Sequence, residues 1–286
     1  MDDTETRVSE ESLASVQAGN RQWWTERTMS YDWKNKIKAE KMTPEWFDEI
    51  DRRFIHGARL FAHDKVPFDR IIPFESLKGK KVLEIGCGMG LHTELMIKAG
   101  ADVTSIDLSD TSVLVTSTRT KNKNLSGQIV QMDAVELQFP DETFDFIWSW
   151  GVIHHSSHTG RIIKEMYRVL KPGGESRVMV YHLDGMPAYI TMVRRYLLKF
   201  WKGVSLDHCL WSDSDGYTAR YYTKDMLSDM LNIFFNDVVV ETYGQDADAV
   251  PLPYRLRQVI LPWISFNVLK KIANKRGGFL FAIAKK

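Results

Sequence analysis

The segment 82–90 constrains the fold of this chain more than any other. Val82, Leu83 and Ile85 form a short apolar run, which is typical of a parallel strand buried on both faces. Glycines at positions 86, 88 and 90 follow, and glycine allows strained backbone dihedrals and close approach of a ligand. Residues 92–99 then have the pattern of a helix. The segment therefore predicts a strand, a ligand-binding turn and a helix.

The spacing of these glycines bears on the ligand. Position 91 is Leu91, so the third glycine of the dinucleotide fingerprint Gly-x-Gly-x-x-Gly is missing, which weighs against a nicotinamide cofactor without excluding it. A second predicted strand, 102–107, ends in Asp107, roughly 20 residues after the first glycine, where such folds place a carboxylate for ribose hydroxyls. Asp107 would serve either kind of cofactor.

Strands and helices alternate through the centre of the chain. We predict strands at 81–86, 102–107, 128–133, 144–149 and 175–182, with helices at 92–99, 110–121 and 161–170. A helix at 223–235 and strands at 237–242 and 278–284 follow. This alternation is typical of an α/β fold with right-handed crossovers.

Three further segments, 129–134, 139–148 and 170–174, follow the glycine turn in a characteristic order and spacing. Together, over about residues 79–183, they resemble the class I S-adenosylmethionine-dependent methyltransferases of the type 11 group. The resemblance implies a Rossmann-like α/β fold: a seven-stranded, mostly parallel sheet flanked by helices, with an N-terminal helical cap and helical insertions after strands five and six. It also implies S-adenosyl-L-methionine as cofactor and S-adenosyl-L-homocysteine as product.

The resemblance assigns roles to residues around the glycine turn. Glu84 would contact the methionine amino group, Asp107 the ribose, and Asp133 with its neighbour the adenine amino group. Strand four would end beside the reacting methyl, at Ser149, Trp150 and Gly151. His92 would touch the methionine tail or cap its helix, and Cys87 is a small residue that fits the turn. The expected cofactor-binding residues are Glu84, Gly86, Cys87, Gly88, Gly90, His92, Asp107, Leu108, Asp133, Ala134 and Trp150.

Two histidines, His154 and His155, follow strand four. An imidazole with a pKa near 6.5 can accept a proton at neutral pH. The pair resembles the His-His of natural-product sugar O-methyltransferases, which implies His155 as general base, His154 as the second choice and Asp184 as the supporting acid. Packing or cofactor contact is the alternative role. A metal cluster with His158 is a further alternative, but the spacing matches no standard zinc pattern. No metal is predicted, and a divalent ion is left open.

The chain is expected to fall into three parts. Residues 1–20 are polar and predict a mobile leader, 21–75 are aromatic-rich and predict a helical cap over the cofactor mouth, and 76–286 form the methyltransferase domain. Insertions at 184–222 and 244–276 would build the acceptor pocket. The expected acceptor contacts are Tyr31, Arg220, Tyr221 and Tyr222, with a structural ion pair as the alternative for Arg220.

The segment 189–202 is an amphipathic helix candidate with cations among bulky apolar residues. We expect a lid with a solvated basic edge. Contact with a membrane surface, or with an acidic acceptor, is the alternative. The segment 213–222 is rich in turn residues and aromatics and is expected to return to the pocket.

The composition of the chain limits the classes of partner that we expect it to bind. The net charge of +1 gives no general attraction to nucleic acid, and two cysteines cannot form a disulfide framework. The acidic start is unlike a secretory signal, and no apolar run is long enough to span a bilayer. We expect a cytoplasmic enzyme with a small-molecule acceptor and no nucleic-acid partner, and leave open peripheral membrane contact and a homodimer.

The expected function is methyl transfer from S-adenosylmethionine to a small molecule, at a hydroxyl of a sugar or polyhydroxylated metabolite, with a histidine as general base. The alternative is C- or N-methylation of an isoprenoid, quinone or amine. A protein methyltransferase and a non-catalytic cofactor-binding scaffold are further alternatives.

Overall fold

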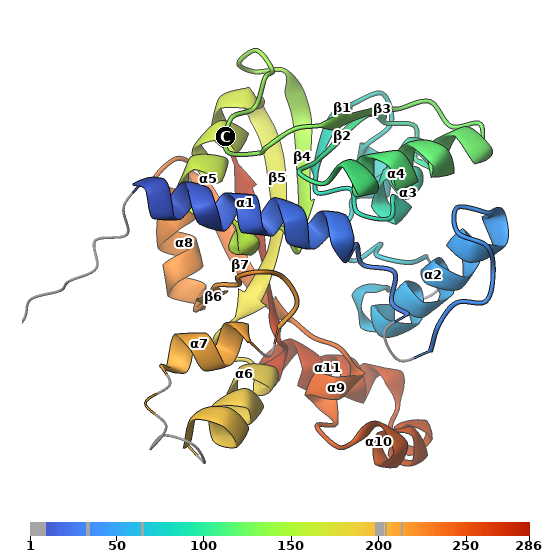
Figure 1. Cartoon of the computed structure of the whole chain (residues 1–286), viewed down its shortest axis with the longest axis vertical. Coiled ribbons are helices and arrows are strands. Elements are labelled where there is room, and N and C mark those ends of the chain that lie inside the picture. The colour runs from blue at the N-terminus through green and yellow to red at the C-terminus, as the bar shows by residue number, and fades with distance from the viewer. Residues whose placement is uncertain (1–9, 33–34, 64–65, 198–202, 204, 213) are drawn as a thin grey trace, which may run out of the picture.

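The computed structural model describes residues 10–32, 35–63, 66–197, 203, 205–212 and 214–286. Its centre is a twisted sheet with helices on both faces (Figure 1). The strand order is β3-β2-β1-β4-β5-β8-β7, with β6 paired to β5. The strands are β1 (Lys81–Ile85), β2 (Asp102–Asp107), β3 (Gln128–Gln131), β4 (Phe144–Trp150), β5 (Leu170–His182), β6 (Tyr221–Tyr222), β7 (Asp237–Tyr243) and β8 (Phe279–Lys285). Only the pairings of β8 with β5 and β7 are antiparallel within this described sheet.

The central strands are buried on both faces, as their continuous apolar runs predict. Leu83 of β1 and Ile147 of β4 belong to one buried cluster, which α5 (Thr159–Val169) and α8 (Lys224–Asn232) cover. Val82 and Phe146, their neighbours along the same strands, belong to the cluster on the opposite face. That second cluster is covered by α3 (Leu91–Lys98) and by the segment 58–77. The Rossmann-like α/β class is therefore confirmed.

The strand count differs from the predicted seven, because the described sheet has eight strands. The additional strand is β6, whose Tyr221 and Tyr222 pair with Tyr181 and His182 at the end of β5. Two residues are too few to show the alternating pattern of a strand, so β6 could not be predicted from the sequence. Two strand boundaries also shift by two or more residues: β5 begins at Leu170 rather than 175, and β3 ends at Gln131 rather than 133.

The N-terminal part differs from the predicted leader. Residues 1–9 lie outside the described residues, but 10–20 form the first turns of α1 (Glu10–Glu26), which crosses the strands (Figure 1). Gln17 and Asn20 hydrogen-bond to residues of the central domain, so this stretch packs on the domain instead of preceding it. Its mobility stays a prediction. In the predicted cap, α2 (Pro44–Gly57) packs on α4 (Asp110–Asn122) through a cluster that contains Phe47 and Val115.

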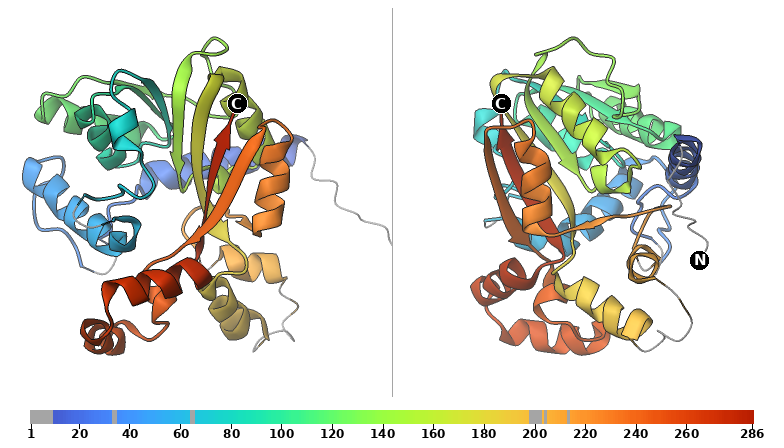
Figure 2. Two further views of the ribbon diagram at one scale, coloured as in Figure 1. Left: turned by 180° about the vertical axis from the view of Figure 1, so that it is seen from behind. Right: turned by 90° about the vertical axis from the view of Figure 1, so that its left-hand side faces the viewer.

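The two insertions lie together at one end of the molecule (Figures 1 and 2). The first contains α6 (Met186–Thr191), a short π-helix (Met192–Tyr196) and α7 (Leu206–Trp211). The second contains α9 (Asp246–Ala249), α10 (Tyr254–Ile260), a 3-10 turn (Leu261–Trp263) and α11 (Phe266–Arg276). Residues 198–202, part of the predicted helix 189–202, lie outside the described residues.

Candidate active site

A cavity of about 460 Å³ opens at the carboxyl ends of β1, β2 and β4. The order β3-β2-β1-β4-β5 reverses direction between β1 and β4, and parallel α/β sheets bind ligands at such a switch point. We call one side of the cavity the glycine half: Gly86, Cys87, Gly88, Gly90, Asp107, Leu108, Asp133 and Ala134. We call the other side the aromatic half: Met29, Tyr31, Phe54, Trp150, His155, Met179, Tyr181, Asp215 and Phe279.

The glycine turn requires its glycines. Gly86 has φ +83°, and a Cβ there would lie 2.2 Å from Cγ2 of Val152, so no other residue fits without displacing that side chain. Gly88 has φ +50°, and a Cβ at this position would meet nothing within 4 Å. The turn therefore leaves open space beside Gly88 in which a ligand can lie against the backbone.

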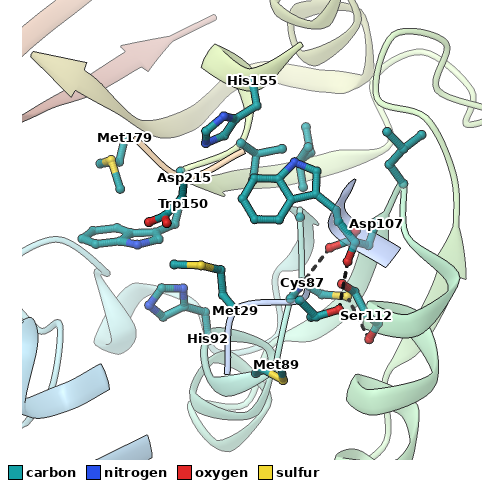
Figure 3. A pocket seen from close by; sticks show the side chains of 18 of the residues that line it. Met29, Cys87, Met89, His92, Asp107, Ser112, Trp150, His155, Met179 and Asp215 are labelled. Carbon is teal, nitrogen blue, oxygen red and sulfur yellow. Dashed lines mark hydrogen bonds between the residues drawn. The ribbon is translucent and has the colours of Figure 1, made fainter. Parts of the chain in front are cut away.

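Asp107 is fixed beside this turn. Its Oδ2 accepts from the N–H of Gly88 at 3.0 Å, and its Oδ1 accepts from the N–H of Ser109 at 2.9 Å (Figure 3). Burial raises the pKa of the Asp107 carboxyl, while these backbone donors favour its ionised form. Asp107 lines the cavity, and a carboxylate in this position can accept from ribose hydroxyls.

Asp133 lies at the far end of the glycine half. Its carboxylate accepts from Nε2 of Gln17 at 3.0 and 3.2 Å and from the N–H of Val135 at 3.0 Å. Gln17 comes from α1, so the N-terminal helix closes this end of the cavity. Asp133 and Ala134 both line the cavity, as the sequence predicts for the adenine end.

Glu84 is placed differently from the prediction. It is buried behind the turn and is not among the residues that line the cavity. Its Oε2 accepts from the hydroxyl of Ser105 at 2.8 Å and from that of Thr93. Burial raises its pKa to about 7. Its position supports β1, α3 and β2 from inside, so direct contact with a cofactor amino group stays a prediction.

His92 lines the cavity from the first turn of α3. Its Nδ1 accepts from Nε1–H of Trp148 at 3.2 Å, which assigns the proton to Nε2. Nε2 has no hydrogen-bond partner within the described part of the chain. Burial lowers the pKa of His92 to about 3, so the ring is neutral at physiological pH. It also packs edge-on against Phe68 and Trp150, and this contact is consistent with a wall rather than a proton acceptor.

His155 is the histidine that reaches the cavity. Its Nδ1 lies 2.7 Å from the carbonyl oxygen of Thr218, in the first insertion. Its backbone carbonyl accepts from Nδ2 of Asn20 at 2.6 Å, and its ring packs edge-on against Trp24, so α1 also holds it. Burial lowers the pKa of His155 to about 4, which keeps the ring neutral.

His154 points away from the cavity. Its side chain is fully buried against Tyr181 and does not line the cavity, and neither ring nitrogen has a partner among the residues described. Burial lowers its pKa well below the usual range. The two histidines lie in a 3-10 turn (Ile153–His155) with their ring centroids 4.2 Å apart, but only His155 lines the cavity.

The predicted acid partner, Asp184, does not reach His155. It is exposed just after β5, where the chain turns at Gly185 into α6. The carboxylate that does line the aromatic half is Asp215, from the first insertion (Figure 3). Partial burial raises the pKa of Asp215. Gly216 beside it lies directly against the His155 ring, since a Cβ there would be 2.5 Å from Nδ1.

The three predicted acceptor contacts in β6 and its approach lie behind the cavity wall. Arg220 donates to the carbonyl oxygens of Ser156 at 2.9 Å and Ser157 at 3.2 Å, so it holds the loop that carries His155. Tyr222 is buried, with its hydroxyl on Thr159, and Tyr221 packs on Tyr181. None of the three lines the cavity. Tyr31 does line it, with its ring stacked on Phe54.

Comparison with known proteins identifies this arrangement. Residues 83–178 match the family described as a methyltransferase domain. The chain carries a methyltransferase domain. The resemblance to class I methyltransferases and the prediction of S-adenosylmethionine as cofactor are thereby confirmed.

Two curated proteins are similar to part of the chain. A ubiquinone biosynthesis O-methyltransferase of Pseudomonas entomophila is 33% identical over 141 residues, which cover 48% of this chain and 58% of that protein. A 27-O-demethylrifamycin SV methyltransferase of Amycolatopsis mediterranei is 31% identical over 129 residues, 44% of this chain and 47% of that protein. The chain thus spans about half the length of the curated relatives it matches.

Solved structures share the fold of the methyltransferase domain. The [4+2]-cyclase SpnF superposes with a TM-score of 0.53 at 20% identity, over 95% of this chain and 96% of that one. An N-methyltransferase of Haemonchus contortus, solved with S-adenosylhomocysteine, gives a TM-score of 0.53 at 20% identity, over 82% and 57% of the two chains. At these identities the likeness shows the fold alone, and a fold can host several activities.

The methyltransferase domain fits its cofactor. The open space beside Gly88 is a cradle that a side chain would fill, and Asp107, which accepts from the N–H of Gly88, lines the same cavity. The cavity volume lies within the range of small-molecule sites. Among the described residues, no group of three His, Cys, Asp or Glu side chains could hold a metal ion. No described helix is long and apolar enough to cross a membrane.

Sequence reasoning missed the contribution of α1 and of Asp215. Gln17, Asn20 and Trp24 follow one another at helical spacing of three and four residues, which places them on one face. That spacing was the available signal. The expectation that 213–222 returns to the pocket is confirmed by Asp215 and Thr218, while Asp213 lies outside the described residues.

Proposed function

We propose that this protein is an S-adenosylmethionine-dependent methyltransferase that methylates a hydroxyl of a small molecule, with His155 as general base. The observation that carries the proposal is the contact between Nδ1 of His155 and the carbonyl oxygen of Thr218. A carbonyl oxygen only accepts, so Nδ1 carries the proton and Nε2 keeps a lone pair. This lone pair belongs to a residue that lines the cavity shared with the glycine turn.

The glycine half would hold the cofactor. Asp107 would accept from the ribose hydroxyls, Asp133 and Ala134 would lie at the adenine, and the backbone of the turn would lie under the methionine and ribose. When bound, S-adenosylmethionine supplies an electrophilic methyl group on a sulfonium centre. The protein then has to orient the acceptor and take its proton.

His155 is suited to the second task because its ring is neutral at physiological pH. The acceptor hydroxyl would give its proton to Nε2 as the new carbon–oxygen bond forms. The imidazolium that results is a buried cation, and the carboxylate of Asp215 in the same half of the cavity would stabilise it. Asn20 and Arg220 would keep the loop of His155 in place through its backbone carbonyls.

The aromatic half favours an acceptor with an apolar, ring-containing body. Its lining is mostly aromatic and thioether side chains, with His155, Asp215 and two tyrosines among the polar groups, and Arg53 and Gln245 also line the cavity. A sugar, as first predicted, would need more hydrogen-bond partners than a hydroxylated ring system. One curated relative is named as a ubiquinone biosynthesis O-methyltransferase and the other as a 27-O-demethylrifamycin SV methyltransferase, and both names support O- over N- or C-methylation.

The test is transfer of isotopically labelled methyl from S-adenosylmethionine into a host extract, separated into water-soluble, lipid and macromolecular fractions. Wild-type protein is compared with His155→Gln. We expect the wild-type protein to place the label in a small molecule as a methyl ether. We expect this labelling to be lost with the His155→Gln variant. Label in a macromolecule, or equal labelling by both proteins, would refute the acceptor class or the base, respectively. No transfer in any fraction would refute the proposed activity.

A further inference from the structure

Helix α10 leaves its apolar side chains uncovered. It contains Tyr254, Leu256, Val259 and Ile260, and none of its residues is buried. The 3-10 turn that follows exposes Trp263 to 87%, and Val259 is 67% exposed. A helix of this length is stabilised by packing an apolar face against something. Leu256, Val259 and Trp263 are each more than half exposed, so they present an apolar surface that a partner can contact.

A second uncovered apolar surface lies at the same end of the molecule. Tyr189, Val193 and Leu197, in and after α6, are exposed at spacings of four residues. Figures 1 and 2 show α6 and α10 at the same end of the protein, below the central sheet in the view of Figure 1. The two insertions meet where α11 ends: a Cβ at Gly185 would lie 2.6 Å from the carbonyl oxygen of Gly277. We call the exposed residues of 189–197 and 252–263 the insertion face.

The charge of these segments is entirely positive. Residues 185–206 and 250–276 contain ten of the 38 lysines and arginines of the chain and none of its 37 acidic residues. Arg255 and Lys271 are exposed examples within the described residues. The net charge of the whole chain is only +1, and three of these cations, Arg194, Arg195 and Arg255, are exposed residues of the insertion face itself. An apolar surface with aromatic residues and a basic surround is what a membrane interface binds.

We infer that the insertion face docks on the surface of an anionic lipid bilayer. The apolar side chains would enter the boundary between headgroups and acyl chains, and the cations would meet lipid phosphates. A second copy of the chain is a poorer partner. A symmetric dimer through this face would place its cations opposite one another, with no acidic residue in either segment to pair with them.

The same strands connect the insertion face to the cavity. Tyr181 of β5 and Phe279 of β8 line the aromatic half, and these strands lead directly into α6 and out of α11. Docking would therefore set the aromatic half above the membrane surface. The inference stands on exposure and charge alone, and it does not depend on methyl transfer.

The experiment is flotation of the full chain with vesicles of phosphatidylcholine alone or with phosphatidylglycerol, at low and high salt. We expect binding to the anionic vesicles, weakened by salt. Trp263→Ser and Val259→Ser should each weaken it roughly tenfold. Arg255→Gln and Lys271→Gln should each weaken it about fivefold. Ile233→Ser is the apolar control, because Ile233 is 71% exposed after α8, and Lys121→Gln is the charge control.

Binding of S-adenosylmethionine by each variant, measured by calorimetry, shows that the variants are folded. Absence of binding to anionic vesicles, or equal loss with Ile233→Ser, would overturn the inference. So would a dimer in sedimentation without lipid that Trp263→Ser dissociates, since the face would then be an interface between copies. Loss of methyl transfer with normal flotation would refute the proposed function and leave this inference standing.

Discussion

The Nδ1 atom of His155 lies 2.7 Å from the carbonyl oxygen of Thr218, so a backbone atom of the first insertion fixes the tautomer of this histidine. In many catalytic pairs a carboxylate does this. A neutral acceptor stabilises an imidazolium less than a carboxylate does, which is consistent with the lowered pKa of His155. The insertion thus contributes to the proposed chemistry as well as to the wall of the cavity.

Replacing His155 by glutamine should lower turnover. Glutamine keeps much of the volume but cannot accept a proton in the pH range of interest, and loss of a general base costs roughly 10²- to 10⁴-fold in rate. The affinity for S-adenosylmethionine should stay within about twofold, because His155 lies in the aromatic half. The measurements are kcat for methyl transfer and cofactor binding by calorimetry. His158→Gln is the control, since His158 contacts Ser157 outside this cavity. If His155→Gln retained wild-type turnover, His155 would have only a packing role.

The stability of the same variant should depend on pH. Burial lowers the pKa of His155 from 6.5 to about 4, so below pH 6.5 the unfolded chain binds a proton that the folded chain does not. This histidine therefore lowers the free energy of unfolding as the pH falls from 6.5 towards 4, by about 1.4 kcal/mol at pH 5.5. His155→Gln removes that loss.

Urea denaturation of both proteins between pH 8.5 and 5.5 measures this difference. Other groups, such as Glu84 with its pKa raised to about 7, contribute with the opposite sign but cancel between the two proteins. The difference in unfolding free energy should be constant from pH 8.5 to 7.5 and then move in favour of the variant. A difference that stays constant down to pH 5.5 would mean that His155 is not held in its neutral form.

Asp107→Asn should weaken cofactor binding by at least roughly tenfold, the equivalent of about 1.4 kcal/mol, because an amide replaces one of two acceptor oxygens by a donor. The same change also removes an acceptor for Gly88 or Ser109. Calorimetric titration with S-adenosylmethionine measures the effect. Asp102→Asn, at the exposed start of the same strand, is the matched control. Equal affinity for the two variants would mean that the strand has been aligned wrongly with the family.

The glycine turn and Asp107 could be predicted because their chemistry is local. A buried strand, a turn that only glycine can adopt and a carboxylate at the next strand end all leave marks within a few residues. Asp133 and Ala134 follow from the same logic. The fold could be predicted from the periodicity of the apolar runs alone. Strand β6 could not be predicted, because a strand of two residues shows no periodicity.

The acceptor side could not be predicted in this way. The resemblance places the supporting acid at Asp184, just after β5, but this residue is exposed where the chain turns into α6. Asp215 and Thr218 lie about 30 residues later in the chain, in an insertion whose apolar residues have no regular period. Gln17 and Asn20 donate side-chain hydrogen bonds to Asp133 and His155, and in sequence such polar residues resemble a solvated helix face.

Arg119→Leu should be strongly destabilising. Arg119 is fully buried and pairs with Asp51 of α2 at 2.5 Å and with Glu94 of α3 at 2.6 Å. It also donates to the carbonyl oxygen of Met89, in the loop next to Gly88. Removal leaves the partly buried Asp51 without its cation and takes one of three cations from the buried Glu94, which still pairs with Lys98 and Lys123. Breaking a buried ion pair in this way costs about 3–5 kcal/mol.

The free energy of unfolding, from denaturant titration at neutral pH, measures this cost. Arg52→Leu is the matched control, because Arg52 pairs with Glu49 on the exposed side of α2 and such pairs contribute less than about 1 kcal/mol. Similar losses in the two variants would contradict the assignment of Arg119 as the buried link between the N-terminal cap and the methyltransferase domain.

Asp215→Asn tests which carboxylate supports His155: Asp215, which the structure places in the cavity, or Asp184, which the sequence predicts. If the Asp215 carboxylate stabilises the imidazolium of His155, its neutralisation should lower kcat/KM on the order of tenfold, the equivalent of about 1.4 kcal/mol. Cofactor affinity should be unchanged, because Asp215 lies in the aromatic half. The same measurement on Asp184→Asn should give wild-type kinetics, since Asp184 is exposed and outside the cavity. A larger loss with Asp184→Asn than with Asp215→Asn would instead favour the acid at the end of β5, and would require the first insertion to rearrange when the acceptor binds.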